Sequence, residues 1–161
     1  MSEFWDWAVE SYGREGVAQA CLRLQDDHDQ NVPLLLWAAW ASLHGVRIDE
    51  GLAARAAEMA LAWADEVIVP LREVRRRLKT ALHSGDDDGR LRLRERVKAV
   101  ELEAEKALMA QLETLVRAGP RLPPEHQAAA LRDGLVQVHA VWSGSGHQEV
   151  LSELTQALTK G

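Results

Sequence analysis

The residues best suited to chemistry in this sequence are four neighbours between two predicted helices, Asp26, Asp27, His28 and Asp29. Carboxylate and imidazole groups bind divalent metal ions when several of them converge from more than one element. Here all of them come from one short segment, and none of the familiar metal-binding spacings is present. The simpler interpretation is a turn in which Asn31 caps the next helix. We expect the capped turn, and Asp26, His28 and Asp29 are weak candidates for a metal site.

Other residue types that serve in catalysis form no recognisable arrangement. The six histidines are scattered along the chain, and Ser42 near His44 does not fit a nucleophile elbow. Asp65 and Glu66 precede Pro70 by one turn, but a solvated helix surface is the simpler interpretation of this pair. No strand is predicted, so no glycine-rich loop follows one to hold a phosphate. We therefore expect no catalytic residue and no cofactor.

Basic residues gather in one part of an otherwise acidic chain. The net charge is −6, yet residues 72–98 hold ten basic and five acidic residues, which gives +5 there and −6 − 5 = −11 elsewhere. Such a separation favours contact with an acidic surface, either on this chain or on a partner. The candidates for partner binding in this segment are Arg72, Arg75, Arg76, Lys79, Arg94 and Arg96.

Two alternatives stay open for these basic residues. They can pair within the chain with Glu101, Glu103 and Glu105, and this is the simpler interpretation. They can also bind an anion or a nucleic acid through four of the arginines. The acidic overall charge and the lack of aromatic residues among the arginines argue against nucleic acid.

Tryptophan is overrepresented, with six residues against one Phe and one Tyr. A tryptophan side chain serves as an anchor in a core or in an interface. The core is the usual place for each, but six in a small helical domain suggest that some line a groove. Trp37 and Trp40, one helical turn apart, are the candidates for partner-binding anchors.

The periodicity of apolar residues is helical throughout, and β-branched residues are sparse. We predict an all-α, single-domain bundle of six or seven helices. Residues 1–142 form the bundle, and residues 143–161 form a Ser/Gly linker with a short amphipathic helix that docks or swaps to a neighbour. Pro70 predicts a kink or break near Val69, because proline removes a helical hydrogen bond. The predicted helices cover about residues 2–12, 15–27, 32–44, 50–69, 71–82, 90–118, 125–142 and 147–158.

No segment predicts export or membrane insertion. The first ten residues lack a basic stretch followed by an apolar run, and no apolar run approaches the roughly 18 residues of a membrane span. The single cysteine, Cys21, cannot form an intramolecular disulfide and falls on an apolar stripe. We expect a cytoplasmic protein that does not contact a membrane.

Three segments of the chain are distinctive in combination: FWDWAVESYGREGVAQACLRLQ at residues 4–25, LQDDHDQNVPLLLWAAW at 24–40 and VIVPLREVRRRLK at 67–79. Together they resemble a family of conserved proteobacterial proteins of about this length whose role is unknown. Its members often have Gly where this chain has Asp29. Because of this difference, the sequence does not decide whether a tight left-handed turn forms there. The resemblance implies a cytoplasmic bacterial protein with a helical domain, and it supplies no catalytic residue.

These features favour a non-catalytic module for protein–protein interaction or regulation. Its expected partner is another protein or a second copy of the chain. The rival hypothesis is a metal-dependent or small-molecule-binding helical enzyme whose pocket joins Asp26, His28 and Asp29 to Trp37 or Trp40. Anion or nucleic-acid binding by residues 72–98 is a third hypothesis.

Overall fold

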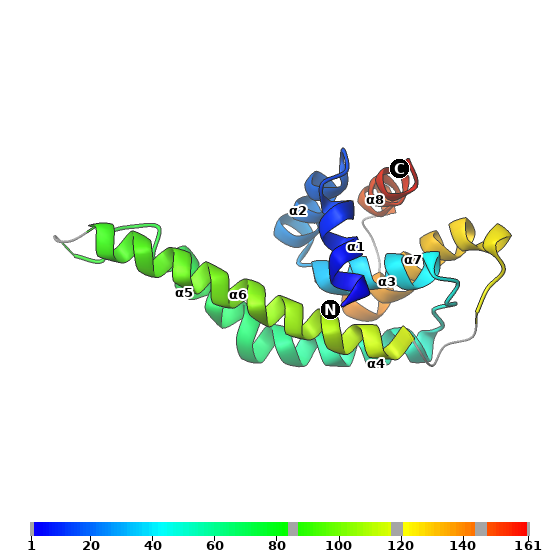
Figure 1. Ribbon diagram of the computed structural model, residues 1–161, viewed down its shortest axis with the longest axis horizontal. Helices are drawn as coiled ribbons and strands as arrows, with labels where there is room; N and C mark the ends of the chain where they lie inside the picture. Colours follow the sequence, from blue (N-terminus) through cyan, green and yellow to red (C-terminus); the bar gives the residue numbers. More distant parts are fainter. Residues whose placement is uncertain (1, 84–86, 117–120, 144–147, 161) are drawn as a thin grey trace.

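The structure is a computed structural model, and it describes residues 2–83, 87–116, 121–143 and 148–160. Within these ranges the chain is all-α, as predicted, and its only β-type pairing is an isolated bridge between Val46 and Arg121. A π-helical turn joins α4 and α5, so the described helices form seven rods (Figure 1). None of them combines the length and the apolar composition that a bilayer crossing needs. The elements are α1 Glu3–Tyr12, α2 Val17–His28, α3 Val32–Leu43, α4 Glu50–Trp63, the π-turn Ala64–Ile68, α5 Val69–Arg77, α6 Asp87–Val116, the 3₁₀ turn Pro124–His126, α7 Gln127–Ser143 and α8 Gln148–Thr159.

Three helices begin at polar residues that cap them, and the predicted cap Asn31 is one of these. Ser2, Asn31 and Asp49 precede α1, α3 and α4 in extended backbone conformation. Each side-chain oxygen accepts the backbone N–H three residues later, at 3.2, 3.0 and 2.8 Å respectively. These bonds satisfy backbone donors that have no partner within the helix, so the starts of these helices are fixed by local chemistry.

The centre of the bundle is α3, which has ten of its twelve residues buried. A helix that is apolar on all sides needs neighbours on all sides, and α1, α2, α4, α6 and α7 all contact it. Phe4 of α1 stacks on Trp40 with ring centroids 5.2 Å apart. α7 approaches α3 most closely at Gly134, where an added Cβ would lie 2.6 Å from the Ser42 hydroxyl.

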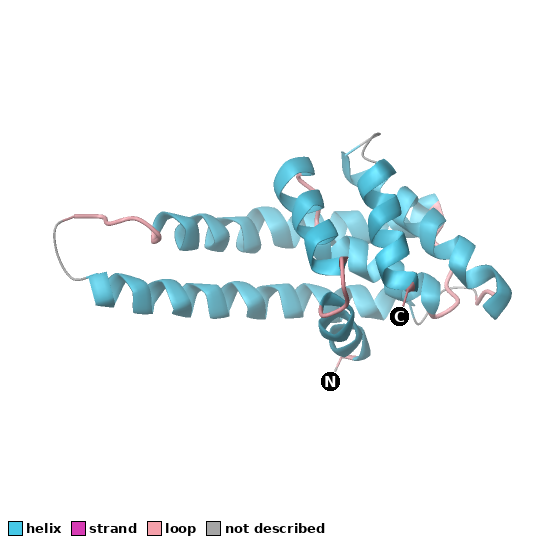
Figure 2. Ribbon diagram, turned by 90° about the horizontal axis from the view of Figure 1, so that it is seen from above, coloured by secondary structure: helices cyan, strands magenta, loops and turns pink. Residues whose placement is uncertain are grey.

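The long helix α6 packs against the rod formed by α4, the π-turn and α5. Together they make a helical hairpin that extends far beyond the other helices (Figures 1 and 2). We call its projecting part, residues 69–83 together with residues 87–102 of α6, the hairpin arm. The bundle proper lies around the opposite end of the hairpin.

The C-terminal helix docks on the bundle of its own chain. Val150, Leu151, Leu154 and Leu158 are buried, and α8 contacts α2 and α7. Exposed Arg23 and Glu153 form an ion pair of 2.6 Å across the α2–α8 contact.

The interruption predicted near Pro70 is present as the π-turn directly before Val69. The loop predicted for residues 84–89 ends earlier than expected, since α6 begins at Asp87. Asp87 and Asp88 suit a first helical turn because their charges are favourable at the positive end of the helix dipole. The linker is predicted to begin at Ser143, but this residue ends α7, and the remaining predicted linker residues, 144–146, lie outside the described residues.

Candidate functional site

The base of the hairpin arm is shaped by Pro70. Proline has no N–H to donate, and its ring clashes with the carbonyl four residues earlier. The helix widens ahead of it instead of ending: the Val69 N–H bonds to the Ala64 carbonyl, five residues back. Such π-turns are rare and occur often near functional sites. Here the turn sets the rotation of α5, which directs Arg72 and Arg75 towards α6.

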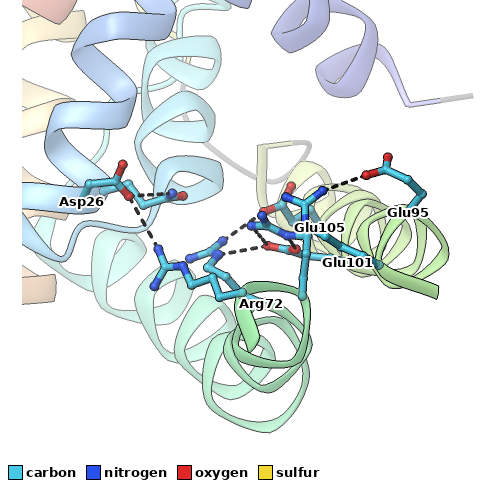
Figure 3. A network of polar contacts seen from close by, with 9 residues as sticks. Asp26, Arg72, Glu95, Glu101 and Glu105 are labelled. Carbon is cyan, nitrogen blue, oxygen red and sulfur yellow. Dashed lines mark hydrogen bonds and ion pairs between the residues drawn. The ribbon is translucent and has the colours of Figure 1, made fainter. Parts of the chain in front are cut away.

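Four charged side chains meet between α5 and α6, and we call them the Arg–Glu cluster: Arg72, Arg75, Glu101 and Glu105 (Figure 3). Arg72 Nε donates to Glu101 Oε1 at 2.9 Å, and its Nη2 donates to Glu105 at 3.3 Å. Arg75 binds both oxygens of Glu101 through Nε and Nη2. Only 8% of the Glu101 side chain is exposed, so one buried carboxylate holds two guanidinium groups.

The two glutamates of the cluster have opposite pKa shifts. Burial alone would raise the pKa of Glu101, but the hydrogen bonds and charges of Arg75 and Arg72 outweigh it and lower that pKa below its ordinary value. Burial raises the pKa of Glu105, and Arg72 offsets this only in part. Glu105 is therefore the less satisfied carboxylate of the cluster, while Glu101 is held ionised.

The contacts of the cluster are ion pairs between α5 and α6. Its two positive and two negative charges balance, and no serine, cysteine or histidine belongs to it. Removing one partner of a buried ion pair is costly, because it leaves a buried charge without compensation. The cluster thus fixes how α6 lies on α5 at the base of the arm.

The acidic corner predicted from the sequence lies next to this cluster. Asp26 Oδ1 is 3.8 Å from Arg76 Nη2 (Figure 3). Asp29 takes the left-handed conformation, with φ +51°, and its carbonyl accepts the indole N–H of Trp142 at 2.8 Å. The carbonyl of His28 accepts from Gln30 Nε2 at 3.0 Å. The left-handed turn is therefore kept here with aspartate in place of glycine.

A cavity of about 270 Å³ opens between this corner and α5. Asp26 of α2 and Asp29 directly after α2 line one side, and Arg72 and Arg76 of α5 line the other. Nowhere in the described ranges do three or more His, Cys, Asp or Glu side chains come together as a metal site would require. Asn31 caps α3 as predicted, and the one ion pair among the described residues between an acidic group of the corner and an arginine joins Asp26 to Arg76.

The two tryptophans predicted as partner anchors belong to the core. Trp37 is completely buried and Trp40 is 4% exposed, so neither indole reaches a partner in this fold. This placement corrects the assignment to a binding surface, and its reason is that α3 is enclosed on all sides. Trp5, at the surface of α1, is half-buried and has the ammonium of Lys106 4.6 Å above its ring.

The six basic candidates fall into two groups. Arg72 and Arg75 belong to the cluster, while Arg76 pairs with Asp26 and Arg94 with Glu95. Lys79 and Arg96 are exposed, and neither has an ion pair with another described residue. The intramolecular interpretation therefore holds for four of the candidates.

Sequence reasoning missed a groove at the elbow between bundle and arm. This elbow groove has a volume of about 540 Å³ and lies between α1, α3 and α6. Its walls are mainly apolar, and Glu105 is the one carboxylate in its lining. Burial raises the pKa of Tyr12 at its rim. Its lining includes Trp5, Val9, Tyr12, Leu36, Leu102 and Met109. A second hollow of about 630 Å³ lies between α2 and α8, away from the cluster.

The comparisons with known proteins give a family and no function. A family model described as a protein of unknown function, DUF2390, matches residues 3–112. No curated protein and no solved structure matches the chain. The matched part runs from α1 through most of α6 and contains the Arg–Glu cluster, whereas α7 and α8 lie beyond it. Because the match covers more than half of the sequence, the chain belongs to the DUF2390 family.

Proposed function

We propose that the chain is a non-catalytic, cytoplasmic module that binds another protein through the hairpin arm. The observation that carries the proposal is a set of large apolar side chains left exposed along the arm. Monomeric proteins rarely leave extended apolar surface uncovered, and helical faces of this kind are typical of binding sites. The exposed fractions are 49% for Val74, 57% for Leu82, 46% for Leu91, 48% for Leu93 and 48% for Val100.

The charge of the arm supports the same proposal. Lys79, Arg92, Arg96 and Lys98 are exposed, and none of them has an ion pair with a described residue. Cations next to exposed leucines favour a partner whose surface combines apolar and acidic groups. The rest of the chain carries the compensating negative charge, with −11 outside residues 72–98 against a total of −6.

The Arg–Glu cluster gives the arm a fixed orientation. A binding element that is rigid before it meets its partner loses less conformational freedom on binding. Because Glu101 is held by two arginines of α5, the two helices of the arm cannot slide without breaking buried ion pairs. Any regulatory effect of the module would act through the bound partner, because the Arg–Glu cluster has no catalytic chemistry of its own.

Affinity capture from extract of the native cell tests the proposal with two matched double variants. Leu91→Asn/Leu93→Asn changes the arm, and Leu22→Asn/Leu61→Asn changes leucines of the bundle that are 47% and 49% exposed. A partner retained by the unchanged chain and the bundle variant, and lost by the arm variant, supports the proposal. The same pattern must then appear with the purified partner. A partner that binds the arm variant equally well contradicts it.

A further inference from the structure

One face of α6 carries a short row of exposed residues, which we call the α6 stripe: Leu91, Glu95, Lys98 and Leu102. The residues are spaced by four, three and four positions, so they lie along the same side of the helix. Leu91 is 46% and Leu102 44% exposed, the Glu95 side chain is 62% exposed, and Lys98 is also exposed. The stripe therefore has an apolar residue at each end and opposite charges between them.

Farther along α6 the same row is covered by α1. Lys106 lies over Trp5, Met109 is buried, and Glu113 accepts hydrogen bonds from Ser2 Oγ and from the Glu3 N–H. The cover ends at the elbow groove, which Leu102 and Trp5 both line. From Leu102 to Leu91 no described element takes the place of α1.

We propose that a second copy of the chain covers the α6 stripe, with its own α6 running antiparallel. This inference rests on the proposed function, because it takes the arm as a protein-binding surface and names the partner. Read in one direction the stripe is Leu-Glu-Lys-Leu, and in the other it is Leu-Lys-Glu-Leu. Antiparallel pairing therefore places Leu91 against Leu102 of the second copy, and Glu95 against its Lys98. The contact is symmetric and uses the same surface on both copies, as two-fold dimers do.

The order of the charges selects this arrangement over the parallel one. In a parallel, in-register pair, Glu95 would face Glu95 and Lys98 would face Lys98, and both contacts are repulsive. Glu95 already accepts a bond from Arg94 of its own chain at 2.8 Å. A carboxylate has about four lone-pair sites, so it can accept the lysine of the second copy as well.

The contact is short, and the dimer is correspondingly weak. Beyond Leu102 the row continues at Lys106, which lies over Trp5 of α1, so the free part of the row ends there. An interface of this size falls below the roughly 1,200 Å² of a standard stable complex. Association is therefore to be measured at high protein concentration, about 0.1 to 1 mM.

Sedimentation velocity of charge variants tests the pairing. Glu95→Lys alone and Lys98→Glu alone each place like charges at both ion pairs, and we expect association at least roughly tenfold weaker than in the unchanged chain. The double variant Glu95→Lys/Lys98→Glu restores complementarity and with it the dimer. An equimolar mixture of the two single variants forms heterodimers, because every lysine then faces a glutamate.

The matched control is Glu103→Lys, which makes the same charge change on a different face of α6 and leaves the dimer as it was. Circular dichroism establishes that each variant is folded. A monomer at 1 mM, or single variants that associate as well as the unchanged chain, overturns the pairing. If the unchanged chain is monomeric but captures another protein that the Leu91→Asn/Leu93→Asn variant does not retain, the proposed function stands. Only the second copy is then refuted as the partner.

Discussion

The bundle and the hairpin arm distribute their residues in opposite ways. In the bundle, apolar side chains such as Trp37 and Leu131 are fully buried, and most charged groups lie outside, with Glu113 at 8% exposure as an exception. In the arm, leucines 91 and 93 are nearly half exposed, whereas at its base the charged side chain of Glu101 is only 8% exposed. Apolar burial thus holds the bundle together, while ion pairs fix the arm and leave its apolar residues available for contact.

The largest effect should follow from removing a whole layer of the bundle. Deletion of residues 148–161 exposes the surface that Val150, Leu151, Leu154 and Leu158 bury on α2 and α7. At about 2 kcal/mol for each buried side chain, the loss approaches about 8 kcal/mol, which is comparable to the whole stability of a domain. Urea unfolding should show a non-cooperative transition or none. An unchanged midpoint would mean that α8 is not part of the core.

A single core substitution should have the next largest effect. Trp37→Ala removes a completely buried side chain and is expected to cost about 4 kcal/mol. In the arm, Leu93→Ala removes a side chain that is 48% exposed, and we expect at most about 0.5 kcal/mol. Denaturant midpoints of the two variants measure the contrast. Equal losses would contradict the division of the molecule into two regions.

These two regions also differ in how well the sequence predicts them. The caps Ser2, Asn31 and Asp49 and the interruption before Pro70 could be predicted, because each depends on atoms a few residues away. The burial of Trp37 could not, since periodicity shows that a helix is apolar but not how many neighbours enclose it. The elbow groove depends on how α1 crosses α6, helices about a hundred residues apart in sequence, and no local pattern records that.

The acidic corner and the basic segment also show how far local sequence patterns predict the contacts of a residue. The sequence places Asp26 and Asp29 close together and predicts Asn31 as the cap, which is correct. It offers Glu101 and Glu105 as partners for the basic segment, and two of the arginines do pair with them. One carboxylate can bind both arginines only because of how the π-turn rotates α5. A proline in the sequence does not specify that rotation.

The Arg–Glu cluster allows a finer test through pH. The pKa of Glu101 is lowered on folding, so its stabilising contribution is present above the ordinary value of 4.5 and is lost as the pH falls through the folded value. The pKa of Glu105 is raised, so its contribution is full below 4.5 and is lost as the pH rises through the folded value. Two glutamates one turn apart should therefore respond to pH in opposite directions.

Neutral variants separate these two responses. Glu101→Gln should cost about 2 kcal/mol at pH 7 and less in acid, where the unchanged chain has lost the same ion pairs. Glu105→Gln should change stability at pH 7 by at most about 0.5 kcal/mol, since it removes a carboxylate that burial disfavours. Thermal unfolding at pH 7 and pH 4 measures both. Identical pH profiles for the two variants would show that the cluster does not lock the arm.

The smallest effect should come from the exposed ion pair of the arm. Arg94 and Glu95 are 2.8 Å apart, but 62% of the Glu95 side chain is exposed, and exposed pairs contribute about 0 to 1 kcal/mol. Glu95→Ala should therefore change the free energy of unfolding by at most about 0.5 kcal/mol, in urea titrations at low micromolar concentration. Because Glu101 and Glu95 lie on the same helix two turns apart, the difference between them isolates burial as the cause. A loss from Glu95→Ala as large as that from Glu101→Gln would mean that the tip of the arm is held as tightly as its base, and the arm would then be an extension of the bundle.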